Sequence, residues 1–208
     1  MSEKRFIEQR LEIEQRDLAD GTKAEYIVGK GIVFNTWSQV LTMETREGHR
    51  IQFIEKIEPT AIEGVDLSNV VSMVNHKLTL GKRSKGTMDV DISADAVHYS
   101  VKIPNTTLGN DTREDVQNGN LEGSSFQFKL APKGDIWDKS SIPYKRTITK
   151  FAAITEMGPV NYPAYLDTTA AMRSLEEFEQ EQRTDDEGDF EKRLQRLTRK
   201  YNYYKTKK

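Results

Sequence analysis

Hydrophobic and polar residues alternate with a period of two near the middle of the chain, where residues 124–130 read Ser-Ser-Phe-Gln-Phe-Lys-Leu. This period is typical of a half-buried β-strand, because successive side chains of a strand point to opposite faces. The alternation places Ser124 on one face with the two phenylalanines, and Ser125 on the other face with Gln127. Residues 119–123 begin and end with glycine, which predicts a turn that opens into this strand.

Strand patterns recur along most of the chain. Apolar runs rich in β-branched and aromatic residues predict strands at Tyr26–Asn35, Ile51–Ile57, Val70–Val74 and Thr147–Thr155. A hairpin is predicted from Thr87–Asp91 and Val97–Ile103, joined by a turn at 93–96. The glycines of the first strand predict a bulge or close backbone packing, and residues 131–146 predict a loop.

Helical signals are fewer than strand signals. Thr60 predicts the cap of a short helix, because Glu63 stands three residues later and completes a capping box. A second helix is expected at Thr112–Asn118, capped by Asp111 or Thr112, and a third at about residues 169–183. Many short strands with few helices predict a mainly β domain of the α+β class, an antiparallel β-barrel with flanking helices.

Composition divides the chain into three parts. Residues 1–24 are charged and predict a frayed lead-in or an edge strand, and residues 25–183 form the predicted central domain. Residues 184–208 begin with an acidic hinge and continue into a basic segment whose apolar residues repeat at helical spacing, namely Phe190, Leu194, Leu197 and Tyr201. This tail is either a solvated helix or a segment that docks on a partner protein.

The overall composition argues against several classes of function. The 208 residues carry a net charge of −2, which gives no reason to expect nucleic acid as a partner. The absence of cysteine excludes disulfides, thiol nucleophiles and thiolate metal sites. No apolar run is long enough to cross a bilayer, and the N-terminus lacks the apolar core of a signal peptide. We therefore expect no membrane partner, no metal and no cofactor, and a protein that works in the cytoplasm.

His76 is the most informative of the three histidines. It comes soon after the apolar strand at Val70–Val74, where its side chain can face a cleft and serve as a general base. His49 lies in a polar turn, and His98 lies in the predicted hairpin with neighbours that point to the opposite face. The alternative for His76 is a structural histidine whose ring nitrogens are satisfied by hydrogen bonds.

A serine hydrolase needs a nucleophile, a base and a group that orients the base. Ser125, at the start of its strand, is the candidate nucleophile, and His76 is the candidate base. Glu156 leaves an apolar strand and is the candidate for the third role. Ordinary alternatives stay open, because serines after a glycine are common in loops and Glu156 can equally be a strand-end carboxylate.

The segments around these residues, taken in order, resemble the prohead maturation serine proteases of tailed bacteriophages. The resemblance covers roughly residues 25–170. It rests on the order and spacing of several stretches, namely Gly29–Asn35, Phe53–Ile62, Asn75–Gly81, Gly86–Met88, Gly119–Phe128, Ile154–Glu156 and Tyr162–Tyr165. No single stretch is specific alone, whereas the ordered set is.

This resemblance implies a fold similar to the herpesvirus assemblin proteases, a β-barrel surrounded by helices. It assigns the catalytic histidine to the Asn-His pair, here His76, and the nucleophile to Ser125, which precedes the aromatic-x-Phe strand. Glu156 aligns with the acidic position of the family's Glu-Val-Ser-like segment, which here reads Glu-Met-Gly. A second departure follows Pro59, where Thr-Ala-Ile stands in place of Gly-Ala-Phe.

The function implied by the resemblance is that of a serine endopeptidase in phage head maturation. It would cleave the major capsid protein or its scaffolding segment inside the procapsid, in the host cytoplasm, and be absent or degraded in the mature virion. The resemblance further implies self-processing, including removal of the charged tail, and allows a homodimer by analogy with the herpesvirus enzymes. The alternative is a catalytically inactive scaffolding or assembly protein with a protease-like fold, which the charged amphipathic tail favours.

Overall fold

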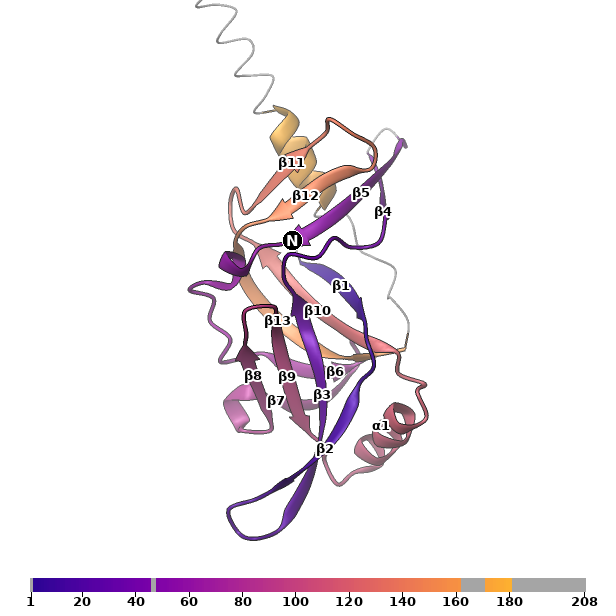
Figure 1. Cartoon of the computed structure of the whole chain (residues 1–208), viewed down its shortest axis with the longest axis vertical. Helices are drawn as coiled ribbons and strands as arrows, with labels where there is room; N and C mark the ends of the chain where they lie inside the picture. The colour runs from indigo at the N-terminus through magenta and orange to yellow at the C-terminus, as the bar shows by residue number, and fades with distance from the viewer. Residues whose placement is uncertain (1, 46–47, 162–170, 181–208) are drawn as a thin grey trace, which may run out of the picture. The chain divides into compact units, whose positions relative to one another are not determined.

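The computed structural model describes residues 2–45, 48–161 and 171–180 (Figure 1). The chain divides into two compact units, residues 1–170 and 171–208. The described part of the second unit is a helix at residues 171–180, within the helix expected at 169–183. The first unit holds three β-sheets, and the predicted tail from 184 onward lies outside the described residues.

The first sheet has five strands in the order β1-β10-β13-β6-β7. Their bounds are β1 (Glu3–Glu8), β10 (Gly123–Leu130), β13 (Phe151–Val160), β6 (Val71–Val74) and β7 (Leu78–Lys82). Neighbouring strands are antiparallel except for β13 and β6, which run parallel. The strand with the serine pair, β10, therefore lies between β1 and β13.

The other two sheets have four strands each. The second sheet contains β2 (Glu12–Asp17), β3 (Lys23–Val33), β9 (Ala96–Lys102) and β8 (Met88–Ile92), in that order. The third contains β11 (Asp135–Asp138), β12 (Tyr144–Ile148), β5 (Arg50–Ile57) and β4 (Leu41–Glu44). Because β1 and β2 occupy edges of their sheets, the segment expected to be a lead-in or an edge strand supplies two edge strands.

The core lies where one face of the first sheet packs against the second sheet. Phe126 and Phe128 are buried on this face, and their rings stack with centroids 5.2 Å apart. Gly29 and Gly31 let β3 approach closely, because an added Cβ at Gly31 would collide with the Met157 side chain. The register of β3 on β9 shifts at Gly31, which confirms the bulge expected among these glycines.

The expectation of a mainly β, α+β fold is confirmed, and so is the hairpin, as β8 and β9. The three sheets are separate ladders in the described part of the chain, and no closed barrel is shown there. The loop predicted at 131–146 is wrong, because β11 and the start of β12 lie in it. The strand predicted at Thr147–Thr155 is in fact the end of β12, two connecting residues, and the first half of β13.

The helix boundaries also differ from those predicted. Helix α1 runs Thr107–Gln117, five residues earlier than expected, because Thr106 rather than Asp111 or Thr112 caps it. The Thr106 hydroxyl accepts a hydrogen bond from the Gly109 N–H at 3.1 Å. The capping box at Thr60 does not form. The short 3₁₀ helix spans Pro59–Ile62 and is preceded by Glu58, without a side-chain cap.

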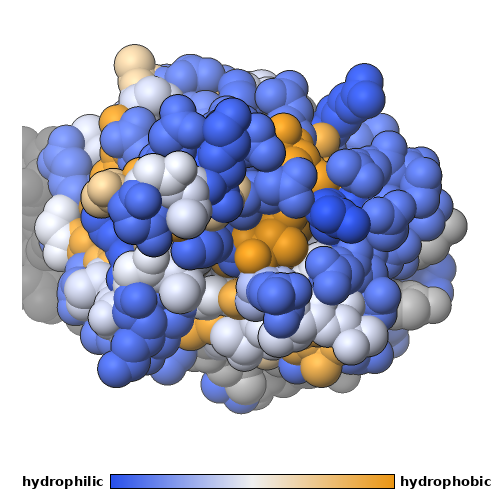
Figure 2. All heavy atoms as spheres, turned by 90° about the horizontal axis from the view of Figure 1, so that it is seen from below, coloured by the Kyte–Doolittle hydropathy of each residue, from blue (hydrophilic) through white to orange (hydrophobic). Residues whose placement is uncertain are grey.

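Hydrophilic residues cover most of the face shown in Figure 2, with hydrophobic residues visible in gaps between them. Among the helices of the described residues, none has the length and apolar character needed to cross a bilayer. The same residues contain no cluster of His, Cys, Asp and Glu that could hold a metal ion.

Candidate active site

The two serines of β10 point to opposite faces of the first sheet, as the alternation predicts. Ser124 is fully buried on the core face, where its Oγ lies 2.9 Å from the Tyr99 hydroxyl. The Gln9 side-chain amide also donates to this Oγ at 2.9 Å. Burial raises the pKa of Tyr99, so its phenol stays neutral and Ser124 belongs to a neutral hydrogen-bonded group in the core.

Ser125 lies on the opposite face, which also carries Glu156. In the β10–β13 ladder Ser125 is opposite Gly158, and Gln127 is opposite Glu156. Directly paired residues and residues two apart share one face of a sheet. The side chains of Ser125 and Glu156 therefore project from the same surface, on neighbouring strands, and both are buried.

His76 lies in a left-handed turn between β6 and β7. Asn75 and His76 have φ angles of 51° and 58°, in a region that few residues other than glycine adopt. Asparagine and histidine are among the side chains that tolerate this conformation best. The turn reverses the chain at the end of β6 and directs the imidazole back along β13.

His76 and Glu156 are in direct contact. The imidazole Nδ1 lies 2.6 Å from the Glu156 Oε1, and the two side chains are only 6% and 7% exposed. The other ring nitrogen, Nε2, is buried and has no hydrogen-bond partner among the described residues. A carboxylate that accepts from Nδ1–H leaves Nε2 as the proton acceptor of a neutral imidazole.

The position of the imidazole relative to Ser125 follows from the ladder. The Asn75 N–H donates to the Pro159 carbonyl at 3.0 Å, so the turn starts beside the end of β13. The His76 ring reaches from there to Glu156, which lies two positions before Gly158, the residue opposite Ser125. No hydrogen bond joins Ser125 to His76 in the described structure, whereas His76 and Glu156 are brought together.

Gly158 is required by the close passage of β6 over this part of β13. A Cβ added at Gly158 would lie 2.8 Å from the Met73 backbone nitrogen and closer still to the Met73 carbonyl oxygen. Met73 belongs to β6, where the register on β7 shifts between Ser72 and Met73. Gly158, the last residue of the Glu-Met-Gly segment that departs from Glu-Val-Ser, thus occupies a position with no room for a side chain.

Replacing Gly158 with alanine should lower both stability and activity. The added methyl overlaps backbone rather than a flexible side chain, so β6 must move away from β13, at a cost of about 1–3 kcal/mol. Because β6 leads into His76, the same movement should separate the imidazole from Glu156. Denaturant unfolding and peptide hydrolysis measure the two effects. Gly64→Asn is the control, because Gly64 has a left-handed φ of 74° that asparagine tolerates and an added side chain there extends into open space. Wild-type values for Gly158→Ala would contradict the close passage.

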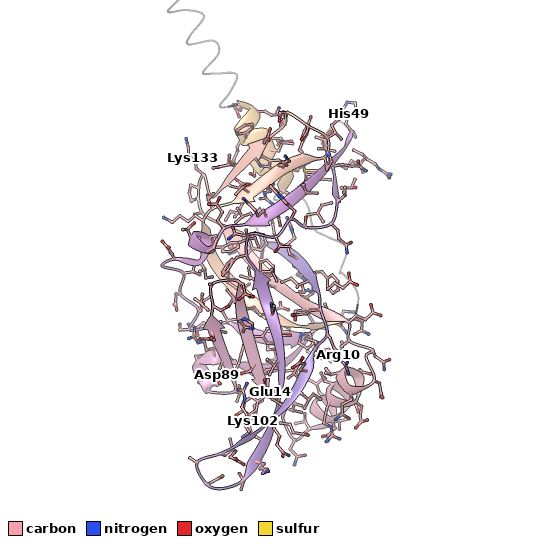
Figure 3. All side chains as sticks on the ribbon, viewed as in Figure 1. Arg10, Glu14, His49, Asp89, Lys102 and Lys133 are labelled. Carbon is pink, nitrogen blue, oxygen red and sulfur yellow. The ribbon has the colours of Figure 1, made fainter. Side chains whose placement is uncertain are left out.

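The other two histidines lie away from Ser125 and Glu156 in the described part of the chain. His49, labelled in Figure 3, lies in the turn between β4 and β5 of the third sheet. The turn with His76 belongs to the first sheet. His98 Nε2 lies 3.2 Å from Ser93 Oγ, a second serine–histidine contact. Ser93 Oγ, however, accepts from the Ala96 N–H and bonds to Asp95 Oδ1 at 2.8 Å, as part of the hairpin turn. The carboxylate there binds the serine and not the histidine, so we interpret this group as turn structure.

A buried charge cluster, which the sequence did not reveal, joins the edge strand β1 to the third sheet. Arg146 on β12 donates to Glu3 at 2.7 and 2.8 Å, to Glu55 at 2.8 Å and to Asp135 at 2.6 Å. Arg5 bonds to Glu3 and to both oxygens of Glu55. Burial alone would raise the pKa of Glu3, but its hydrogen bonds and its proximity to the two arginines outweigh this and lower it.

Several residues around the site were not singled out from the sequence. Gln9 lies in the segment expected to be a lead-in, and Tyr99 in a strand where it reads as an ordinary core residue. Asn161 follows β13 directly and bonds to Asn75, which had been noted only as the neighbour of the histidine. The one available signal was the Asn-His dipeptide after an apolar strand, since asparagine is favoured in left-handed turns.

Comparison with known proteins gives one match. A family model described as caudovirus prohead serine protease matches residues 9–181, which is most of the chain. No curated protein and no solved structure matches. The matched range includes Ser125, His76 and Glu156.

Proposed function

Because the chain belongs to the caudovirus prohead serine protease family, we propose that it is a serine endopeptidase whose catalytic residues are Ser125, His76 and Glu156. The family supports a role in capsid maturation inside the procapsid. The observation that carries the assignment of residues is the buried contact between His76 Nδ1 and Glu156 Oε1, on the face of the sheet from which Ser125 projects.

The state of the imidazole supports this assignment over a structural histidine. Buried ring nitrogens in structural histidines are generally hydrogen-bonded, because leaving one unpaired costs about 1–3 kcal/mol. His76 has one nitrogen held by Glu156 and the other buried without a partner in the described part of the chain. A general base requires such an available nitrogen, and Ser125 projects from the same sheet face as Glu156.

In the proposed mechanism His76 Nε2 takes the hydroxyl proton of Ser125 as Oγ attacks the peptide carbonyl. Glu156 accepts from Nδ1–H throughout, which fixes the ring and stabilises the imidazolium that forms. His76 then gives the proton to the leaving amine, and an acyl-enzyme on Ser125 remains. A water activated by the same nitrogen hydrolyses it. Ser124 is unsuited to this role, because its hydroxyl is fully buried and bonded to Tyr99 and Gln9.

The proposed substrate is the major capsid protein or its scaffolding segment, and self-processing is a further part of the proposal. The motivation is the family, whose members are described as prohead proteases. Homodimer formation, the domain boundaries at 24/25 and 183/184, and loss of the protein from the mature virion stay proposals of the same kind.

Covalent labelling tests the assignment most directly. The purified chain is treated with a fluorophosphonate probe, digested and mapped by mass spectrometry, and the adduct is expected on Ser125. The same protein co-expressed with the phage's major capsid protein should produce a shortened capsid protein, seen by intact mass. An adduct on Ser124 would move the nucleophile to the neighbouring residue. Unlabelled serines together with full-length capsid protein would contradict the protease and favour the scaffolding alternative.

A further inference from the structure

Asn75 makes hydrogen bonds that its left-handed backbone conformation does not require. Its side-chain Oδ1 accepts from the Asn161 backbone N–H at 2.9 Å, and its Nδ2 donates to the Asn161 Oδ1 at 3.0 Å. Its own backbone N–H donates to the Pro159 carbonyl at 3.0 Å. Three hydrogen bonds thus tie one residue of the turn to the end of β13.

These bonds connect the two halves of the His76–Glu156 pair. Asn75 precedes the histidine directly, and Pro159 and Asn161 lie three and five positions after Glu156 in the sequence. The ladder between β6 and β13 contains a single paired position, Glu156 with Val71. Backbone pairing alone therefore connects the end of β6 only weakly to β13. The carboxamides of Asn75 and Asn161 supply the missing connection between the turn and the strand.

We propose that Asn75 and Asn161 form an amide clasp that holds the His76 turn against β13 and so fixes the imidazole on Glu156. The clasp consists of the two hydrogen bonds of the Asn75 side chain, one to the Asn161 side chain and one from the Asn161 backbone N–H. Both asparagines are positioning residues, because they act through His76. The expected effect of the clasp on hydrolysis rests on the proposed function. Its expected effect on the His76–Glu156 hydrogen bond rests on the geometry alone.

The clasp explains a conformational cost that would otherwise be uncompensated. Two consecutive non-glycine residues with left-handed φ are conformationally unfavourable, and they persist only when surrounding contacts hold them. A turn that needed only the left-handed conformation would be served equally well by glycine. Asn75→Gly therefore separates the two roles, because glycine keeps the conformational freedom and removes the carboxamide.

The chain offers a matched control for this substitution. Asn35 also has a left-handed φ, 55°, and lies on the exposed surface. No side-chain hydrogen bond of Asn35 is found among the described residues, in contrast to Asn75. Asn35→Gly thus repeats the backbone change without the loss of a clasp, and is expected to behave like the wild type.

The first measurement is proton NMR on the Ser125→Ala background, which needs no protease activity. The Nδ1 proton shared between His76 and Glu156 should give a resonance far downfield of the backbone amides, absent from His76→Gln. We expect Asn75→Gly to broaden or remove this resonance, Asn161→Ala to shift it, and Asn35→Gly to leave it unchanged. An unchanged resonance in Asn75→Gly would overturn the clasp.

The second measurement is steady-state hydrolysis of a peptide spanning the capsid cleavage site. Asn75→Gly should lower kcat on the order of 100-fold with little change in KM, as a small misplacement of a catalytic group does. Asn161→Ala should lower kcat less. The double variant should be no slower than Asn75→Gly alone, since the bond lost in Asn161→Ala is one of the two already lost in Asn75→Gly. Wild-type kcat in Asn75→Gly, or independent losses that multiply, would overturn the inference. An inactive wild type with the expected NMR changes would count against the protease and not against the clasp.

Discussion

Ser125→Ala and His76→Gln should each slow hydrolysis of a capsid-derived peptide by roughly a million-fold, the scale on which serine proteases respond to loss of nucleophile or base. The double variant should be no slower than either single variant, because nucleophile and base act as one unit. Glu156→Gln should cost about ten-thousand-fold, since the amide removes the charge that stabilises the imidazolium but leaves serine and histidine in place. Single-turnover kinetics with purified proteins measures these ratios.

Neighbouring residues provide the controls for this series. Ser124→Ala removes a serine one position away and leaves Tyr99 and Gln9 without their partner, so it should lower stability by about 1–3 kcal/mol and keep the chemistry. His98→Gln removes a histidine from the β8–β9 hairpin and should have little effect on the rate. A Ser125→Ala variant that cleaves at the wild-type rate would exclude Ser125 as the nucleophile.

Arg146→Met should destabilise the fold by roughly 3–5 kcal/mol, which is the range for breaking a buried ion pair from one side. The Arg146 side chain is fully buried, and its loss leaves the carboxylates of Glu3, Glu55 and Asp135 with less compensation. Urea unfolding measures the change, in the Ser125→Ala background so that the proposed self-processing plays no part. A urea midpoint equal to that of the Ser125→Ala parent would contradict a stabilising role for the buried charge cluster.

The controls for Arg146 separate burial from charge. Lys30→Met removes a cation from an exposed pair with Asp95 and should leave the midpoint close to that of the parent protein. Glu3→Gln combined with Arg146→Met should be less harmful than the sum of the single changes, because the partners share one network.

The same cluster predicts a dependence on pH. The pKa of Glu3 in the folded protein is below its ordinary value of 4.5. Its pairing therefore stabilises the fold fully above the unfolded pKa, and this contribution is lost as the pH falls through the folded pKa. Glu3→Gln lacks the titrating group, so its stability should fall less steeply on acidification below about 4.5.

Much of the fold was predictable from periodicity, because the first and second sheets each bury one face. The alternation in β10 correctly separated Ser124 from Ser125, and the glycines of β3 correctly indicated a bulge. The sequence patterns missed part of the third sheet, because β11 and β12 are short and β12 has a buried arginine, Arg146, at its centre. A hydropathy pattern predicts that an arginine is exposed. Arg146 is buried because the fold places three carboxylates around its side chain.

The candidate site was predictable residue by residue but not as an arrangement. His76 and Glu156 are 80 residues apart in sequence and meet because β6 runs parallel to β13. Parallel pairing leaves no local turn signal, so no pattern in the sequence indicates which strands will be neighbours. The pairing of these residues was proposed from the chemistry of a serine hydrolase, and the resemblance to prohead proteases supported it. Neither argument predicted the asparagine contacts that hold the His76 turn to β13.

The strand order of the first sheet has a consequence for synthesis on the ribosome. This sheet is assembled from residues 3–8, 71–82, 123–130 and 151–160, so contacts of long sequence separation must close before it exists. Glu156 emerges last of the three proposed catalytic residues, and β13 is the strand that connects the serine strand to the histidine turn. A nascent chain that ends before β13 thus has a serine and a histidine with nothing to bring them together. The proposed active site therefore forms only after β13 has been synthesised.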